Sequence, residues 1–235
     1  MSCLLAGMVF LLSVTTSGQQ ITGRFYAIDD SHTGSETAVS DTVRDAGSFQ
    51  AEKRVALTFD DGPNETFTPK LLDGLKERNV KATFFVLGKQ AEQFPQLVKR
   101  IVEEGHQVGC HGYEHVNMLS LSMEEACTQM NKTSDLLLEI TGQRPLFMRP
   151  PYGSCQKKLA ERSQMIEVGW GIDTLDWSLR NADQVVAETL RKVEDGSIIL
   201  MHDEFQESVD AALRLADVLQ KEGYQLVTVE DLILD

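Results

Sequence analysis

Two neighbouring carboxylates and a pair of histidines are the residues of this sequence best suited to chemistry. Asp60 and Asp61 stand in ALTFDDGPN, directly after an apolar run that ends at Phe59. Adjacent carboxylates repel, so a half-buried pair needs a cation between them or a proton on one of them. His111 and His115 stand in CHGYEH at i and i+4, a spacing that on a helical turn puts both imidazoles on one side, as a divalent metal requires.

The two motifs can serve one site if one aspartate binds a metal while the other handles a proton. Two histidines and a carboxylate leave an open position, as in catalytic zinc sites where bound water becomes acidic. Each motif also has an ordinary reading. A lone HxxxH is common on surfaces, and DDGPN is dense in turn-forming residues. We interpret the turn as the element that aims the two carboxylates.

The elements that must position these residues alternate along the chain. From Arg54 onward short apolar runs are followed by amphipathic helical patterns, which is typical of a mostly parallel α/β sheet, either closed into a barrel or open. The expected strands are residues 55–59, 82–87, 107–110, 146–148, 166–172, 197–201 and 225–228.

Polar, chemically capable residues follow most of these strands. In parallel α/β architectures the functional residues gather at the carboxyl ends of the strands, so these residues are expected on one rim. They are Asp60 and Asp61 after the first strand, His111 after the third, Arg149 after the fourth, Asp173 after the fifth and His202 after the sixth.

Composition narrows the class of protein. The chain has 235 residues, 42% hydrophobic and 25% charged, which fits one globular domain with a sizeable core. A formal net charge of −14 gives no electrostatic basis for binding nucleic acid or an anionic membrane. Cysteines stand at positions 3, 110, 127 and 155 without a CxxC pair, which argues against a cysteine zinc site and leaves one disulfide or buried thiols as alternatives.

The amino-terminal segment predicts export. Residues 1–18 contain the apolar run CLLAGMVFLLSV, too short to span a bilayer, and we expect a signal peptide or a short retained anchor. Residues 19–52 are polar and lack periodicity, as in a linker or arm. Either reading of the first segment places the rest of the protein outside the cytoplasm, secreted or membrane-anchored.

Five motifs in order carry a family resemblance. TFDDGP, HGYEH, RPPYG, DTLDW and LMHD resemble the motifs of the polysaccharide deacetylases, the NodB-homology carbohydrate esterases, over residues 53 to 232. The resemblance implies a single catalytic domain at 53–235 with a distorted (β/α)7 barrel. It also implies metal-dependent removal of acetyl groups from N-acetylated sugars of peptidoglycan or chitin, or from acetylated xylan.

The resemblance assigns a role to each motif. Asp60 becomes the general base, and Asp61, His111 and His115 become the ligands of a divalent ion, with zinc as the first expectation and cobalt or another transition metal as alternatives. Arg149 is implied to hold Asp60, the N–H of Tyr152 to bind the oxyanion, Asp173 to pair with the general acid His202, Trp177 to wall the acetate pocket, and Leu200 to lie beside the acetyl methyl group.

One position departs from the family pattern. Gly112 stands where relatives usually carry Ser or Thr, so we expect looser surroundings for the second histidine. His106 is expected to pack at the base of a strand, and Glu114 to point to solvent.

The function expected first is peptidoglycan N-deacetylation. Deacetylation of chitin oligosaccharides or acetyl-xylan is the alternative enzyme reading, and a non-catalytic wall-binding module is the alternative of another class. The presence of the base, the acid, the arginine and all three ligands disfavours the module. The expected partner is a polysaccharide substrate, either peptidoglycan or a chitin-like glycan. We expect the protein to be a monomer without a nucleic-acid partner or a specific protein partner.

Overall fold

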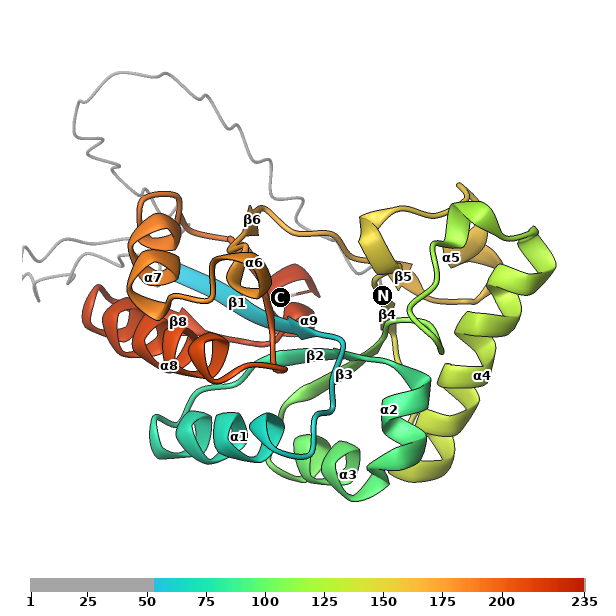
Figure 1. The fold of residues 1–235 in the computed structure, drawn as a ribbon, viewed down its shortest axis with the longest axis horizontal. Helices are drawn as coiled ribbons and strands as arrows, with labels where there is room; N and C mark the ends of the chain where they lie inside the picture. Colours follow the sequence, from blue (N-terminus) through green and yellow to red (C-terminus); the bar gives the residue numbers. More distant parts are fainter. Residues whose placement is uncertain (1–52, 235) are drawn as a thin grey trace, which may run out of the picture. The chain divides into compact units, whose positions relative to one another are not determined.

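A parallel sheet of short apolar strands forms the centre of the structure (Figure 1). The computed structural model describes residues 53–234, so the expectations for residues 1–18 and 19–52, together with Cys3, lie outside the described part. The strands are β1 (Lys53–Asp60), β2 (Thr83–Val86), β3 (Gln107–Cys110), β4 (Phe147–Met148), β5 (Ile166–Glu167), β6 (Ile172–Asp173), β7 (Ile198–His202) and β8 (Tyr224–Leu226).

Seven strands follow one path, in the order β5-β4-β3-β2-β1-β7-β6, and β8 pairs with the start of β1. Every ladder is parallel, so the carboxyl ends of the strands lie at one edge. The register aligns Asp60 with His202 across β1 and β7, and with Phe85 across β1 and β2. Two of the chemically capable residues are therefore neighbours through sheet pairing alone.

Residues 166–172 do not form the single strand expected from the sequence. They form β5 and β6, which lie at opposite ends of the sheet path and are joined by residues 168–171. No ladder joins β5 to β6 among the described residues, so the sheet is a curled, open form of the expected barrel. The physical reason is that the carbonyls of Val168 and Gly169 accept hydrogen bonds from Arg149 rather than from a neighbouring strand.

Helices surround the sheet (Figure 1). Contacts run from α7 to α8, from α8 to α1, from α1 to α3 and from α3 to α4. None of the helices described in residues 53–234 is both long and apolar enough to cross a bilayer. The helices are α1 (Phe67–Glu77), α2 (Gly88–Gln93), α3 (Pro95–Glu103), η1 (Met118–Ser120), α4 (Met123–Thr141), η2 (Pro151–Gly153), α5 (Leu159–Arg162), α6 (Asp176–Leu179), α7 (Ala182–Leu190), α8 (Gln206–Lys221) and α9 (Val229–Leu234).

Local sequence signals explain where several helices begin and end. Ser122 and Glu125 form the predicted capping box at the start of α4, and Gly142 ends that helix in the left-handed conformation with φ 77°. The side chain of Asn181 accepts from the N–H of Gln184 at 3.1 Å, which caps α7 as predicted.

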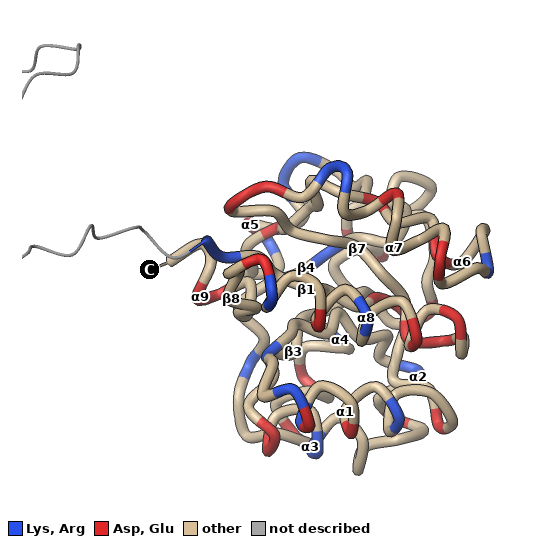
Figure 2. The backbone as a smooth tube through the Cα atoms, turned by 90° about the vertical axis from the view of Figure 1, so that its left-hand side faces the viewer, with Lys and Arg blue, Asp and Glu red and all other residues tan. Residues whose placement is uncertain are grey.

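The main core lies between the sheet and α1, α3 and α8. Phe59 and Phe84 pack with ring centroids 5.2 Å apart, and Leu71, Leu215 and Leu219 are fully buried against the same cluster. Charged residues of both signs lie on the surrounding helices and loops (Figure 2). For example, Arg78, directly after α1, donates two hydrogen bonds of 2.9 and 3.0 Å to Asp217 of α8. The fold therefore depends on apolar burial, while ion pairs near the surface contribute little.

Arg149 is the largest polar exception in this interior. Its side chain is fully buried and donates to Asp60 Oδ1 at 2.7 Å, to Thr58 Oγ1 at 2.8 Å, and to the carbonyls of Val168 at 3.1 Å and Gly169 at 2.9 Å. The guanidinium also lies 4.1 Å from the ring centroid of Phe85. Arg149 thus connects β1 with residues 168–171, the segment that joins β5 to β6 where the sheet is open.

Replacing Arg149 should destabilise the fold strongly. Arg149→Met keeps the apolar stem but leaves the buried carboxylate of Asp60 unpaired, which costs about 3–5 kcal/mol for a broken buried pair. Urea unfolding should show this loss in the free energy of unfolding. The matched control is Arg191→Met at the exposed pair with Glu188, expected to cost less than about 1 kcal/mol. Equal effects in the two variants would contradict a central role for Arg149.

Candidate active site

Three ligand-type side chains meet at the carboxyl ends of β1 and β3. Nε2 of His111 lies 3.4 Å, and Nε2 of His115 lies 3.3 Å, from Oδ1 of Asp61. A tetrahedral ion with bonds of about 2.1 Å holds its ligand atoms about 3.4 Å apart. The structure therefore brings the predicted ligands to separations that one ion can bridge. Within residues 53–234, Asp61, His111 and His115 are a group of three ligand-type side chains close enough to share one ion, and we call this group the metal corner.

The chemistry of these atoms also fits a cation. Oδ1 of Asp61 is buried without a hydrogen-bond partner, a costly state that a bound ion would relieve. Burial alone would raise the pKa of Asp61, but its interaction with His111 and the charges of the other two histidines lower it. Nδ1–H of His111 donates to the carbonyl of Arg149 at 2.7 Å, which leaves the Nε2 lone pair for a metal. Burial lowers the pKa of His115, which favours the neutral ligand form.

The two histidines do not lie on a helix, which corrects one expectation. Residues 111–117 form a loop, and His115 itself has φ 52°. The turn at Gly112, with φ 79°, helps to fold the loop back so that both rings face Asp61, with ring centroids 5.3 Å apart. The i, i+4 spacing predicted the proximity correctly but not the conformation that produces it.

Gly112 has a structural explanation that the sequence did not provide. Its left-handed backbone favours glycine, and a Cβ atom there would lie 2.7 Å from Cε of Met118. Its carbonyl accepts from the N–H of Gly88 at 2.9 Å and from Oγ1 of Thr133 at 2.8 Å. Backbone and side-chain donors thus hold the loop at Gly112, while the looser surroundings expected for His115 stay a prediction.

Asp60 stands beside the metal corner with its carboxylate already oriented. Oδ1 binds Arg149 at 2.7 Å, and Oδ2 lies 3.8 Å from Nε2 of His111. The Oγ1 atom of Thr58, which donates to the carbonyl of Ile199 at 2.8 Å, also accepts from Arg149. Oδ2 is therefore the carboxylate oxygen of Asp60 on the side where a water near the ion would lie.

The partner of His202 is Asp176, and the assignment of this role to Asp173 is wrong. Nδ1 of His202 lies 2.8 Å from Oδ1 of Asp176, whose Oδ2 also accepts from the backbone N–H of His202 at 2.9 Å. Asp173 instead accepts from the N–H of Leu175 at 2.9 Å. The two aspartates of DTLDW are three positions apart, and α6 begins at the second one, which turns Asp176 inward to 1% exposure.

His202 is held in its charged form. Burial alone would lower its pKa, but the hydrogen bond and charge of Asp176, with the charges of Asp61 and Asp60, raise it to about 9. Nε2 lies 3.9 Å from Oδ2 of Asp61, on the cavity side. Since Asp176 occupies Nδ1, the proton on Nε2 is the one available to a bound molecule.

A cavity of about 510 Å³ opens over these groups. The side chains of Tyr152 and Trp177 lie on its wall with 65% and 55% exposure, and Leu200 is buried in its lining. The ring of Tyr152 lies 4.7 Å from that of His115. The structure therefore brings together all the residues to which the motifs assigned a role in the site, and it adds Asp176 and Glu204. Glu204 has one sequence signal, its position two residues after His202.

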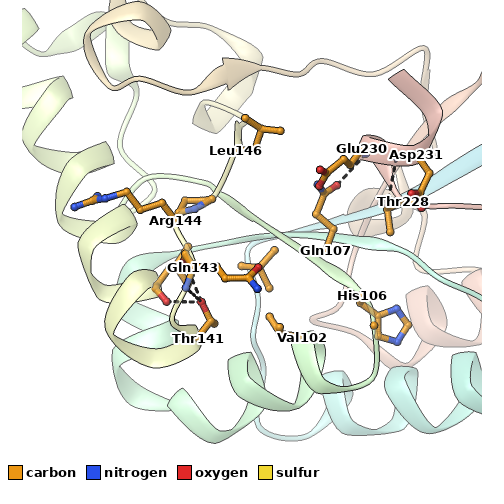
Figure 3. Close-up of a pocket in the computed structure, with 14 residues that line it drawn as sticks. Val102, His106, Gln107, Thr141, Gln143, Arg144, Leu146, Thr228, Glu230 and Asp231 are labelled. Atoms are coloured by element: carbon orange, nitrogen blue, oxygen red, sulfur yellow. Dashed lines mark hydrogen bonds between the residues drawn. The ribbon is translucent and has the colours of Figure 1, made fainter. Parts of the chain in front are cut away.

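A second cavity lies at the opposite, amino-terminal edge of the strands, between α3, α9 and the start of β4 (Figure 3). His106 lines it, is 5% exposed, and accepts from the N–H of Ala82 at 3.2 Å. Burial, followed by the charge of Lys81, lowers the pKa of His106 to about 4. This histidine is neutral and structural, as expected from the sequence.

The cysteines of the described part are free thiols. Cys110 is fully buried and lies 3.6 Å from the sulfur of Met130, while Cys155 donates to Glu167 at 3.4 Å. Burial raises the pKa of both thiols to about 12, so neither is a reactive thiolate.

The fold and the site together define a class of protein. A parallel α/β half-barrel carries an Asp-His-His corner with an arginine-bound carboxylate on one side and a protonated histidine on the other, an arrangement suited to the hydrolysis of unreactive bonds. The model of the polysaccharide deacetylase family matches residues 48–168. This chain belongs to that family, as its motifs suggested.

Individual relatives agree with the family match. The peptidoglycan-N-acetylglucosamine deacetylase PgdA of Listeria monocytogenes is 44% identical over 183 residues, which are 78% of this chain and 39% of that protein. The peptidoglycan-N-acetylmuramic acid deacetylase PdaC of Bacillus subtilis is 41% identical over 77% of this chain and 39% of that protein. The chain thus spans about two fifths of the length of these curated relatives.

Solved structures confirm the expected fold. The PdaC structure has a TM-score of 0.75 at 41% identity and covers 77% of this chain and 90% of that chain. A protein described as a CE4 family pseudoenzyme, from Bacillus anthracis, has a TM-score of 0.74 at 32% identity and covers 79% of this chain and 66% of that chain. The same fold therefore occurs in proteins described as deacetylases and in one described as a pseudoenzyme.

Metal binding should depend on the three-residue corner. Adding Zn²⁺ or Co²⁺ should raise the melting temperature by mass action, and a chelator should reverse the shift. His111→Ala should abolish the shift and reduce calorimetric affinity at least about tenfold. The matched control is Glu114→Gln, an exposed residue between the two histidines, which should leave both measurements unchanged. Unchanged metal affinity in His111→Ala would disprove the ligand set.

The Asp176–His202 pair should set the basic limit of any activity that uses His202 as an acid. With a pKa of about 9, His202 stays protonated through neutral pH and loses its proton only as the pH rises toward that value. Asp176→Asn removes the charge, so the pKa should fall toward roughly 6.5 and the basic limb of the kcat/KM profile should move to lower pH.

The control for this shift is Asp183→Asn on α7, whose carboxylate is exposed and pairs with Arg214. It should leave the basic limb in place. An Asp176→Asn profile that keeps the wild-type limb would show that another group sets it.

Proposed function

We propose that the protein is an exported, metal-dependent N-deacetylase that hydrolyses the acetamide groups of peptidoglycan amino sugars. The observation that carries this proposal is the convergence of Asp61, His111 and His115 between a held carboxylate and a protonated histidine. Relatives named as peptidoglycan deacetylases support the substrate class. The apolar run in residues 1–18 supports a location outside the cytoplasm, either secreted or membrane-anchored.

The first half of the reaction uses Asp60. When bound at the corner, the ion supplies Lewis acidity, which polarises the acetamide carbonyl and makes a nearby water more acidic. Oδ2 of Asp60 takes the proton of that water as the new C–O bond forms, while Arg149 keeps the other oxygen fixed. The N–H of Tyr152, on the cavity wall, is proposed to donate to the oxyanion. Such a contact contributes about 3–4 kcal/mol elsewhere.

The second half uses His202. The C–N bond of an amide breaks easily only when the nitrogen is protonated, and Nε2–H of His202 faces the cavity to supply that proton. Cleavage then leaves acetate and a free amine. Leu200 and Trp177 line the space proposed for the acetyl methyl group. Base and acid keep different proton states because one adjoins a cation and the other an anion.

A catalytic role is supported over a binding role by the complete set of groups. A non-catalytic module needs neither the ion-pair partner of the base nor that of the acid, yet Arg149 and Asp176 are both buried against their partners at 2.7 and 2.8 Å. Buried charged pairs are difficult to justify by stability alone. The presence of both buried pairs therefore favours a catalytic role over a binding role.

Acetate release tests the function. The wild type with metal should release acetate from purified peptidoglycan, and Asp60→Asn should lower the rate by at least about 10² while retaining metal. Chelation should abolish release, and metal addition should restore it. Near-full activity of Asp60→Asn would overturn the assignment of the base, and release from chitin pentamer or acetyl-xylan alone would overturn the peptidoglycan proposal.

A further inference from the structure

Two carboxylates in the active-site cavity have no part in the proposed reaction. Asp173 and Glu204 line the cavity and are partly exposed to it. Asp60 is paired with Arg149, and Asp61 belongs to the metal corner. Asp173 and Glu204 therefore remain as carboxylates next to the reacting position that no lysine or arginine of the cavity lining neutralises.

Basic side chains near the cavity are already engaged. Among the described residues that line it there is no lysine or arginine. Arg149 is fully buried below and bound to Asp60. Arg180 stacks on the ring of Phe205 at 3.7 Å and pairs with Glu207 at 3.2 Å. The cationic groups of this cavity are His202 and the ion proposed at the metal corner, and each already has an anionic partner, Asp176 for His202 and Asp61 for the ion.

Glu204 already experiences an unfavourable environment for charge. Burial, then the neighbouring charges of Asp61 and Asp176, raise its pKa, while His202 acts in the opposite direction. A further anion brought into the same partly dehydrated space would meet repulsion that water screens only in part.

Peptidoglycan offers two amino sugars that differ in this respect. The acetamide of both sugars is attached to C2. On the neighbouring carbon, C3, N-acetylmuramic acid carries a lactyl ether and N-acetylglucosamine carries a hydroxyl. In strands without peptides the lactyl group ends in a carboxylate. A ring seated with its acetamide at the metal corner must bring this neighbouring substituent into or beside the cavity.

We propose that Glu204 and Asp173 are specificity-determining residues that make the site select amino-sugar rings without an adjacent carboxylate. This inference rests on the proposed deacetylation and adds a charge-based selection of which sugar ring is deacetylated. The aromatic walls at Tyr152 and Trp177 accept either ring, since both sugars present the same apolar faces. Discrimination comes from charge at the C3 substituent.

Peptide-free glycan strands test the proposal because both rings occur in one substrate. Mass spectrometry that resolves which ring lost its acetyl group should show that the wild type favours N-acetylglucosamine. Glu204→Gln and Asp173→Asn should each lower that preference by roughly threefold to tenfold, the size expected from one unit charge across about 8 Å of partly hydrated protein. Raising the salt concentration should lower the wild-type preference as well.

Two controls separate charge from shape. Glu103→Gln removes a carboxylate of α3 at the other edge of the sheet and should leave the preference unchanged. Strands whose lactyl groups are converted to neutral carboxamides keep the size but lose the charge, and they should be deacetylated more evenly.

The outcomes are distinct for the two proposals. Preferential deacetylation of muramic acid rings, or a preference insensitive to the variants, to salt and to the carboxamide, would overturn the selection mechanism and leave the deacetylase function standing. Absence of acetate from both rings would overturn the function and the selection together.

Discussion

The buried ion pair between Arg149 and Asp60 is the interaction on which the rest of the site depends. A guanidinium without exposure to water is tolerable only if its donors are occupied, and here they bind a carboxylate, a hydroxyl and two backbone carbonyls. The same group fills the place where strand pairing is absent between β5 and β6. One side chain therefore completes the architecture and fixes the oxygen that is proposed to act as base.

The site gives the two groups that are proposed to transfer protons partners of opposite charge. Asp60 adjoins a permanent cation, whereas His202 adjoins the buried carboxylate of Asp176. Parallel pairing of β1 with β7 places the two groups in register, so the distance between them is set by the sheet and not by flexible loops. A scaffold of this kind keeps both groups oriented before a substrate arrives.

Much of this arrangement could be predicted because it follows strand ends. Residue type and spacing indicate His111, His115 and the pair Asp60 and Asp61, and the parallel alternation correctly indicates a common rim. The choice of Asp61 as the ligand comes from the family resemblance. The sequence could not choose between Asp173 and Asp176, since the choice depends on where α6 begins. It also could not show that residues 166–172 are two strands, because short apolar runs do not reveal which neighbours their carbonyls bind.

The contact between Gly112 and Met118 has an evolutionary consequence. A hydroxyl-bearing residue at position 112 needs both a different backbone angle and room where the methionine methyl now lies. Neither substitution is tolerated easily by itself, so a lineage moving between the two forms of this loop should alter both positions in close succession. Positions 112 and 118 should therefore change together among related sequences, even where the histidine ligands stay the same.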